Sequence, residues 1–134
     1  MTVVSLIRSD SLAASAPYAS ASTAPADARL VFLAGSCPLD SHGDVVAPDD
    51  IAAQARLCVD NLEAALGAAG ATLRDVLSTR VLVATTRQPD LVSAWNVVRE
   101  AFGDHDAPST LFGVTVLGYP GQLVEVEAIA AVRD

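Results

Sequence analysis

Hydrophobic and polar positions alternate regularly along the C-terminal part of the chain. The stretch from Pro108 to Val132 contains two alternating apolar runs, separated by Gly118-Tyr119-Pro120-Gly121. Because Gly and Pro interrupt strands, this pattern predicts a strand, a turn or loop, and a second strand. In the second run Glu125 and Glu127 share one face, roughly 7 Å apart along the strand. The opposite face is wholly apolar, with Val124, Val126, Ala128, Ala130 and Val132.

Three further apolar runs predict strands. Thr2–Arg8 is a short β-branched run, Arg29–Gly35 is bounded by turn residues, and Val76–Thr85 contains Arg80 as its one charge. Between the first two, Ser11–Ala28 is rich in Ala, Ser and Pro, a composition typical of a linker or loop.

Helical spacing of apolar residues predicts two helices. The first is capped by Asp49 or Asp50, runs to about Ala69 and is closed by Gly70; the second covers Gln88–Phe102. Helices that alternate with strands predict an α+β fold, with one mixed sheet of about six strands and both helices on a single face. Because the other face also carries apolar residues, we expect copies of the chain to cover it in a homo-oligomer.

Composition limits the class of protein. A chain of 134 residues fits one domain over residues 1–134, and its 18% of charged residues is low enough to suggest surface covered by partner subunits. The net charge of −8 repels phosphate backbones, which argues against nucleic acid as a partner. All eight basic residues are Arg, which excludes Schiff-base chemistry and a Walker-type phosphate loop.

Neither a secretory signal nor an apolar run of membrane-spanning length is visible, so we expect a cytoplasmic protein without a membrane partner. Cys37 and Cys58 are predicted to be inert free thiols, because neither has His and acidic partners at recognisable spacing. His42 and His105 lie in polar loops and are predicted to be surface residues rather than metal ligands.

Several segments together resemble the reactive-intermediate deaminases, the Rid or YjgF-type family. The resemblance rests on Pro17-Tyr18, Gln54-Ala55-Arg56, Asp60-Asn61, Ala68-Ala69-Gly70, Asn96, Glu100-Ala101-Phe102 and, above all, Leu123 to Ala130. It extends over nearly the whole chain. It implies a chorismate-mutase-like fold, a homotrimer with small-molecule clefts between subunits, and hydrolysis of imines or enamines without a metal or organic cofactor.

The same resemblance suggests roles for individual residues. Glu125 matches the family's catalytic carboxylate, which positions or activates water, and Tyr18 matches the residue that closes the cleft. Gly35 takes a position whose backbone faces the ligand. The alternatives are a Glu125 paired at a subunit interface, a Tyr18 that only anchors the surface, and a Gly35 that only ends a strand. Glu127 is predicted to be structural.

The chain departs from the family where substrate is held. Thr110 stands at the position of the arginine that grips the substrate carboxylate, and Phe112 stands at that of a cysteine lining the cleft. A hydroxyl cannot replace a bidentate guanidinium, so we expect a more apolar cleft and a substrate other than an ordinary 2-imino acid. Arg80 and Arg99 are the candidates for a relocated anion-binding residue; each is otherwise a solvated or ion-paired residue.

Three functions therefore remain open. The first is a cofactor-free hydrolase that deaminates an imine or enamine, and the second is a non-catalytic trimer that binds a metabolite. The third is ribonuclease activity, which has been attached to some family members, and the net charge of −8 argues against it.

Overall fold

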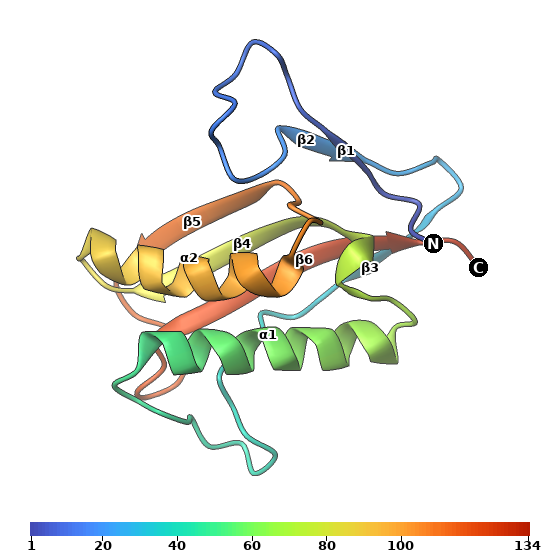
Figure 1. Cartoon of the computed structure of the whole chain (residues 1–134). Helices are drawn as coiled ribbons and strands as arrows, with labels where there is room; N and C mark the ends of the chain where they lie inside the picture. Colours follow the sequence, from blue (N-terminus) through green and yellow to red (C-terminus); the bar gives the residue numbers. More distant parts are fainter.

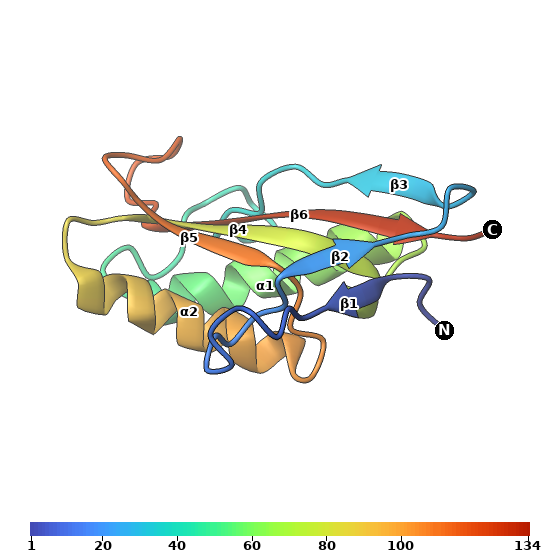
Figure 2. The same ribbon diagram turned by 90° about the horizontal axis from the view of Figure 1, so that it is seen from above.

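The computed structural model describes residues 1–134. Its two helices are α1 (Ile51–Ala68) and α2 (Gln88–Phe102), and a short 3₁₀ turn spans Leu73–Asp75. Six strands follow the chain in the order β1 (Ser5–Ile7), β2 (Ala21–Thr23), β3 (Arg29–Phe32), β4 (Val76–Ala84), β5 (Ser109–Val114) and β6 (Val124–Val132). Both helices lie on the same face of the main sheet, and the two chain ends lie close together (Figures 1 and 2).

The main sheet has the order β3-β6-β4-β5 and is mixed. Strand β6 runs antiparallel to both of its neighbours, whereas β4 and β5 are parallel and are joined by the crossover through α2. The predicted α+β class and the two helices on one face are confirmed. The six strands, however, are divided: β1 and β2 form a separate two-stranded ribbon instead of joining the sheet. Strand β2 lies inside the segment that composition had assigned to a linker.

The helix boundaries follow the predicted signals closely. Of the two candidate caps, Asp50 is the one used, and its side chain accepts a hydrogen bond of 3.0 Å from the Ala53 N–H. At the other end Gly70 adopts a φ of 79°, a conformation that favours glycine and stops the helix. Helix α2 has the predicted bounds.

The core lies between the helices and the sheet. Its largest fully buried side chains come from both helices, β4 and β6, and include Leu62, Leu66, Val76, Val81, Val98, Val124 and Val126. Buried among them, Gln54 donates hydrogen bonds to the carbonyls of Ala47 (3.1 Å) and Gly121 (2.9 Å) and accepts one of 2.7 Å from the Leu123 N–H. One side chain thus joins α1 to the loop before β6, the strand that carries both glutamates.

The histidine prediction is wrong for one of the two residues. His105 is buried, and its Nε2–H donates a hydrogen bond of 2.8 Å to the Val76 carbonyl at the start of β4. His42 is exposed, as predicted. Asp104 and Asp106 make the sequence next to His105 look like a polar surface loop. The segment is nevertheless held against the core, since Phe102 and Ala107 on either side of it are buried as well. This histidine secures the end of α2 to the sheet.

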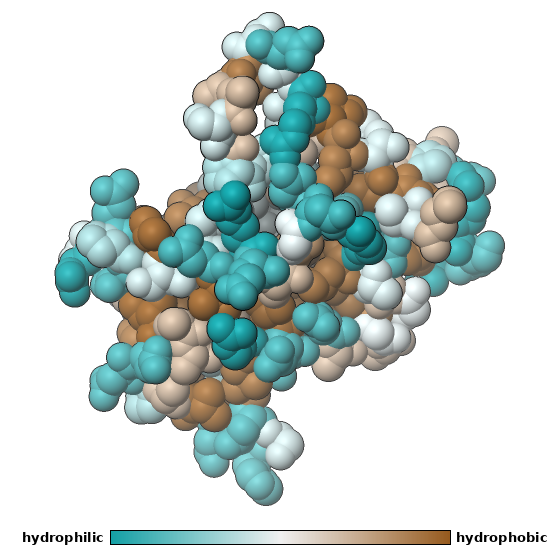
Figure 3. Space-filling view, in the orientation of Figure 1, coloured by the Kyte–Doolittle hydropathy of each residue, from teal (hydrophilic) through white to brown (hydrophobic).

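The outer face of the sheet, opposite the helices, carries no helix (Figure 2). Large apolar side chains are exposed on the two edge strands: Leu30 (52%) and Phe32 (72%) on β3, and Phe112 (38%) on β5. On the helical side, hydrophilic residues lie at the periphery and across the centre, with apolar residues visible between them (Figure 3). Neither helix is both long and apolar enough to cross a membrane.

Candidate functional site

Strand β6 separates core residues from candidate functional residues. Val124 and Val126 are buried against α1, whereas Glu125 and Glu127 point to the outer face and are partly exposed. The register places Glu125 opposite Leu82 of β4, and Glu127 opposite Arg80. The predicted arrangement of the two carboxylates on one face is therefore present.

The Glu125 carboxylate is held by two donors on the same oxygen. Its Oε1 accepts a hydrogen bond of 3.2 Å from the Cys37 thiol and one of 3.1 Å from the Gln122 side-chain amide. Gln122 is itself buried and is fixed by the Val124 carbonyl and the Tyr119 N–H. Because both donors take Oε1, Oε2 accepts no hydrogen bond from the protein. Oε1 is therefore fixed by the protein, whereas Oε2 has no protein donor.

Gly35 makes room for this carboxylate. A Cβ at residue 35 would lie 2.3 Å from Glu125 Oε2 and 2.7 Å from its Cδ, closer than non-bonded atoms approach. The backbone at Gly35 is not in the left-handed region, so conformational freedom is not the reason for glycine here. Residue 35 is glycine because Glu125 approaches it closely. Two residues that were predicted separately as site residues thus lie side by side.

Cys37 has a partner that sequence spacing did not reveal. Burial, with the hydrogen bond and charge of Glu125, raises the pKa of its thiol from 9.0 to about 11. The group is therefore a neutral donor near pH 7 and a poor nucleophile. Its backbone carbonyl accepts a hydrogen bond of 2.9 Å from the Asn61 side chain on α1. Cys58 lies deeper, and burial raises the pKa of its thiol further.

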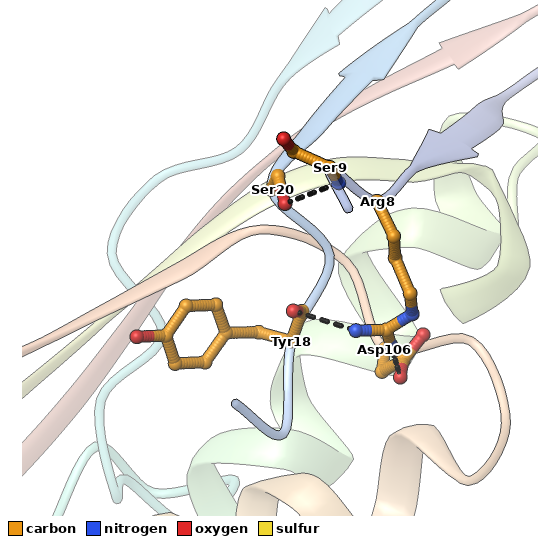
Figure 4. A network of polar contacts seen from close by, with 5 residues as sticks. All are labelled: Arg8, Ser9, Tyr18, Ser20 and Asp106. Atoms are coloured by element: carbon orange, nitrogen blue, oxygen red, sulfur yellow. Dashed lines mark hydrogen bonds and ion pairs between the residues drawn. The ribbon is translucent and has the colours of Figure 1, made fainter. Parts of the chain in front are cut away.

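Tyr18 belongs to a second group of residues, near the N-terminal ribbon. Its carbonyl accepts a hydrogen bond of 2.9 Å from Arg8, which also forms an ion pair with Asp106 (Figure 4). The ring points away from that ion pair and meets Trp95 edge-on, with ring centroids 6.4 Å apart. Arg8 and Asp106 thus hold Tyr18 in place, a role that nothing in the local sequence indicated.

A cavity of about 810 Å³ lies between the loop that precedes β2 and the starts of β4 and β5. Tyr18, Arg80 and Thr110 all line it, together with Ser78 and the loop residues around Leu12. This is the largest cavity that contains any of the sequence-selected residues. It brings the candidate cleft-closing tyrosine and the substituted clamp position to one place.

The remaining candidates lie elsewhere. Phe112 stands across Leu82 from Glu125 in one row of the outer face, and roughly 10 Å separates their two strands. Glu125 does not line the large cavity. Arg99 is on the exposed side of α2 and lines only a small cavity of about 20 Å³ with Pro17 and Trp95. Within one chain, the residues around Tyr18 and those around Glu125 therefore form two separate groups.

No group of three or more His, Cys, Asp or Glu side chains is placed to share a metal ion. The two groups offer a carboxylate with one free oxygen, a phenol, hydroxyls and an arginine. Such groups can bind a small polar molecule and transfer protons to or from water.

Comparison with known proteins shows the family and the fold of the chain. A sequence model of the family described as Endoribonuclease L-PSP matches residues 8–132. The chain belongs to this family, also called YjgF or Rid. A RutC family protein of Pyrococcus horikoshii is 32% identical over 114 residues, 85% of this chain and 86% of that protein. The 3-aminoacrylate deaminase RutC of Acinetobacter baylyi is 30% identical over 117 residues, 87% and 88% of the two chains.

Solved structures of Rid proteins share the fold. The crystal structure of the Rid family protein YyfB from Yersinia pestis has a TM-score of 0.87 and 28% identity, covering 97% of this chain and 99% of that one. A YjgF family member from Mycobacterium tuberculosis has a TM-score of 0.66 and 34% identity, covering 96% and 99%. The expected chorismate-mutase-like architecture is therefore confirmed for this Rid chain.

Proposed function

We propose that this Rid protein hydrolyses a small imine or enamine and releases ammonia without a cofactor. The observation that carries the proposal is the Glu125 carboxylate, with Oε1 fixed by two donors and Oε2 unoccupied by protein donors. The similarity of the chain to a 3-aminoacrylate deaminase supports this class of reaction at the level of the family.

The proposed chemistry needs one group that accepts and returns a proton. The reacting species is the protonated imine, which an enamine becomes by gaining a proton from solvent at carbon. Glu125 takes a proton from water as the water oxygen adds to the C=N carbon, which gives a neutral carbinolamine and a protonated Glu125. Glu125 then returns this proton to the nitrogen, the C–N bond breaks and ammonia leaves. The hydroxyl group loses its proton to the departing ammonia or to solvent and becomes the carbonyl, so the products are a carbonyl compound and ammonium. Cys37 and Gln122 keep the carboxylate oriented through these steps.

Thr110 shapes the expected substrate. It stands on β5 where an active relative is expected to carry arginine, and a hydroxyl forms no charge-assisted pair with a carboxylate. Phe112 adds apolar surface two residues further along the same face. We therefore expect that an ordinary 2-imino acid, with its carboxylate held at position 110, is not the substrate.

We also propose that the protein acts as a homotrimer of single-domain cytoplasmic chains. The exposed apolar side chains of Leu30, Phe32 and Phe112 on an uncovered sheet face support this assembly. It would bring the Tyr18 group of one copy to the Glu125 group of its neighbour. The separation of the two groups within one chain is thus an expected property of a site shared between copies.

A competition assay tests the hydrolase. Imines that are not 2-imino acids, generated in situ from primary amines by a flavin amine oxidase, partition between hydrolysis and capture by semicarbazide, so catalysis lowers the yield of semicarbazone. Glu125→Gln is expected to abolish the effect, since the amide cannot accept the proton. Glu127→Gln is the matched control, on the same face of the same strand, and is expected to retain activity. Equal activity of the parent and Glu125→Gln would overturn the proposal.

A non-catalytic metabolite-binding trimer is the second candidate. The observation that favours it is that the large cavity contains Tyr18 and Thr110 but not Glu125. A metabolite that raises the melting temperature and is recovered unchanged after incubation would support this function. Turnover that depends on Glu125 would exclude it.

A further inference from the structure

Arg80 and Thr110 are direct partners on neighbouring strands. The parallel register of β4 and β5 pairs them, and strand alternation puts both on the outer face, while Thr79 and Val81 are buried. Both also line the cavity that contains Tyr18. The two Cα atoms are therefore about one strand spacing, ~4.8 Å, apart. Position 110 carries no positive charge, but its cross-strand neighbour Arg80 does.

The Arg80 guanidinium is not committed to an ion pair. Five of the eight arginines form ion pairs within the chain, namely Arg8, Arg29, Arg74, Arg87 and Arg133. Of the other three, Arg56 lies on α1 and Arg99 on α2, so Arg80 alone combines a free charge with the outer face of the sheet. Glu127 is its cross-strand neighbour on β6, yet the two side chains do not form an ion pair.

The surroundings of Arg80 suit a small anion. Ser78, Thr110 and Tyr18 contribute hydroxyl groups to the cavity lining, and Asp10 is the only carboxylate in it. The second cation of the lining, Arg8, is neutralised by Asp106. Because the chain carries a net charge of −8, an anion is repelled from most of the surface and needs a local positive group.

We propose that Arg80 is the anion-binding residue of this site, and that the substrate carries a carboxylate or similar group. That the bound molecule is a substrate rests on the proposed hydrolase, but binding of an anion at Arg80 does not depend on catalysis. Strand β4, which carries Arg80, lies between β6 and β5, so Arg80 stands one strand nearer to β6 than Thr110 does. The anionic group therefore binds nearer to β6 than a residue at position 110 would hold it.

Binding of stable carbonyl compounds tests this assignment without any turnover. The probes are pyruvate and 4-oxopentanoate, whose carboxylates stand at different distances from the carbonyl group, and the neutral amide of each. Isothermal calorimetry measures the affinity of the parent protein for each probe. The acid that binds better is expected to have an affinity roughly tenfold or more above that of its amide, as a charge-assisted bidentate pair implies. Arg80→Gln is expected to reduce that ratio to near one, and Arg80→Lys to retain part of it.

An exchange of the two side chains gives the sharpest control. Arg80→Thr combined with Thr110→Arg moves the guanidinium to the neighbouring strand on the same face, and is expected to recover anion preference that Arg80→Thr alone loses. Arg56→Gln removes an equally unpaired charge from α1 and is expected to leave binding unchanged. Light scattering of each variant shows whether the oligomer is intact, and variants are compared at equal oligomeric state.

The outcomes separate this inference from the hydrolase. An acid-to-amide ratio that is unchanged in Arg80→Gln, or a parent that does not prefer the acids, overturns the role of Arg80 even if imine hydrolysis is observed. Arg80-dependent binding of the acids with no hydrolysis upholds the anion site and removes the proposed reaction.

Discussion

Gly35→Ala is expected to displace the Glu125 carboxylate, the proposed catalytic group, while leaving the fold intact. The added Cβ would lie 2.3 Å from Glu125 Oε2, 2.7 Å from Cδ and 3.1 Å from Cγ. To restore even a 3.0 Å contact, Oε2 must retreat by about 0.7 Å, and the carboxylate is the flexible end of its side chain. The hydrogen bonds from Cys37 and Gln122, already 3.2 and 3.1 Å long, are expected to break.

The cost in stability is expected to be moderate. Each lost hydrogen bond to a charged group contributes about 1.5–3 kcal/mol, but the partly exposed carboxylate recovers water. Alanine also reduces the entropy of the unfolded chain by about 0.4–1 kcal/mol. The net loss is then about 1–3 kcal/mol, which for a chain of this length lowers the melting temperature by roughly 3–9 °C. Activity is expected to fall about 100-fold, since small misplacements of a catalytic group are that costly.

Three measurements check this reasoning. Calorimetry gives the melting temperature, the semicarbazide competition gives activity, and alkylation by iodoacetamide, followed by peptide mass spectrometry, gives the reactivity of Cys37. Removing the Glu125 carboxylate from the thiol lowers the pKa of Cys37, so alkylation is expected to become faster in Gly35→Ala. Gly67→Ala is the control, because a Cβ there meets nothing within 4 Å and a helical site gains about 0.5–1 kcal/mol. A Gly35→Ala protein with parental activity and parental alkylation would refute the account.

Three further predictions follow from other parts of the structure. Gln54→Leu removes three buried hydrogen bonds to main-chain groups and is expected to cost about 3–5 kcal/mol in denaturant unfolding, with the released groups left unpaired. Burial raises the pKa of both Cys37 and Cys58, so the folded chain retains thiol protons that the unfolded chain loses. The free energy of unfolding should therefore fall as the pH rises from about 9 towards 11. A melting temperature that does not change over that pH range would contradict this prediction. Phe32→Ser is expected to lower the oligomeric mass in light scattering without lowering the melting temperature of the monomer, because the ring is 72% exposed within the chain.

Much of the fold follows from local pattern. The bounds of α2 and the alternation of β6 were predictable because each element is long and has one apolar face. Strand β2 was not, because Ala21–Thr23 is three small residues whose strand character comes from pairing with β1, not from its own side chains. The burial of His105 likewise depends on a contact with a strand start 29 residues away.

The candidate site was less predictable, since its parts meet only through tertiary contacts. Glu125 and Tyr18 were selected by resemblance, but their supporting residues were not: the thiol of Cys37 is 88 residues from Glu125 in sequence, and Arg8 is 98 residues from Asp106. The pairing of Arg80 with Thr110 depends on the register of two parallel strands joined by a helix. No spacing rule in a single sequence gives that register.

The division of β6 and β4 into a buried and an uncovered side has a consequence for how this protein can diversify. Arg80 and Thr110 are exposed within the chain, so exchanging them is expected to leave the melting temperature nearly unchanged while altering recognition at the proposed anion site. New specificities are then reachable through single substitutions that selection for folding does not oppose.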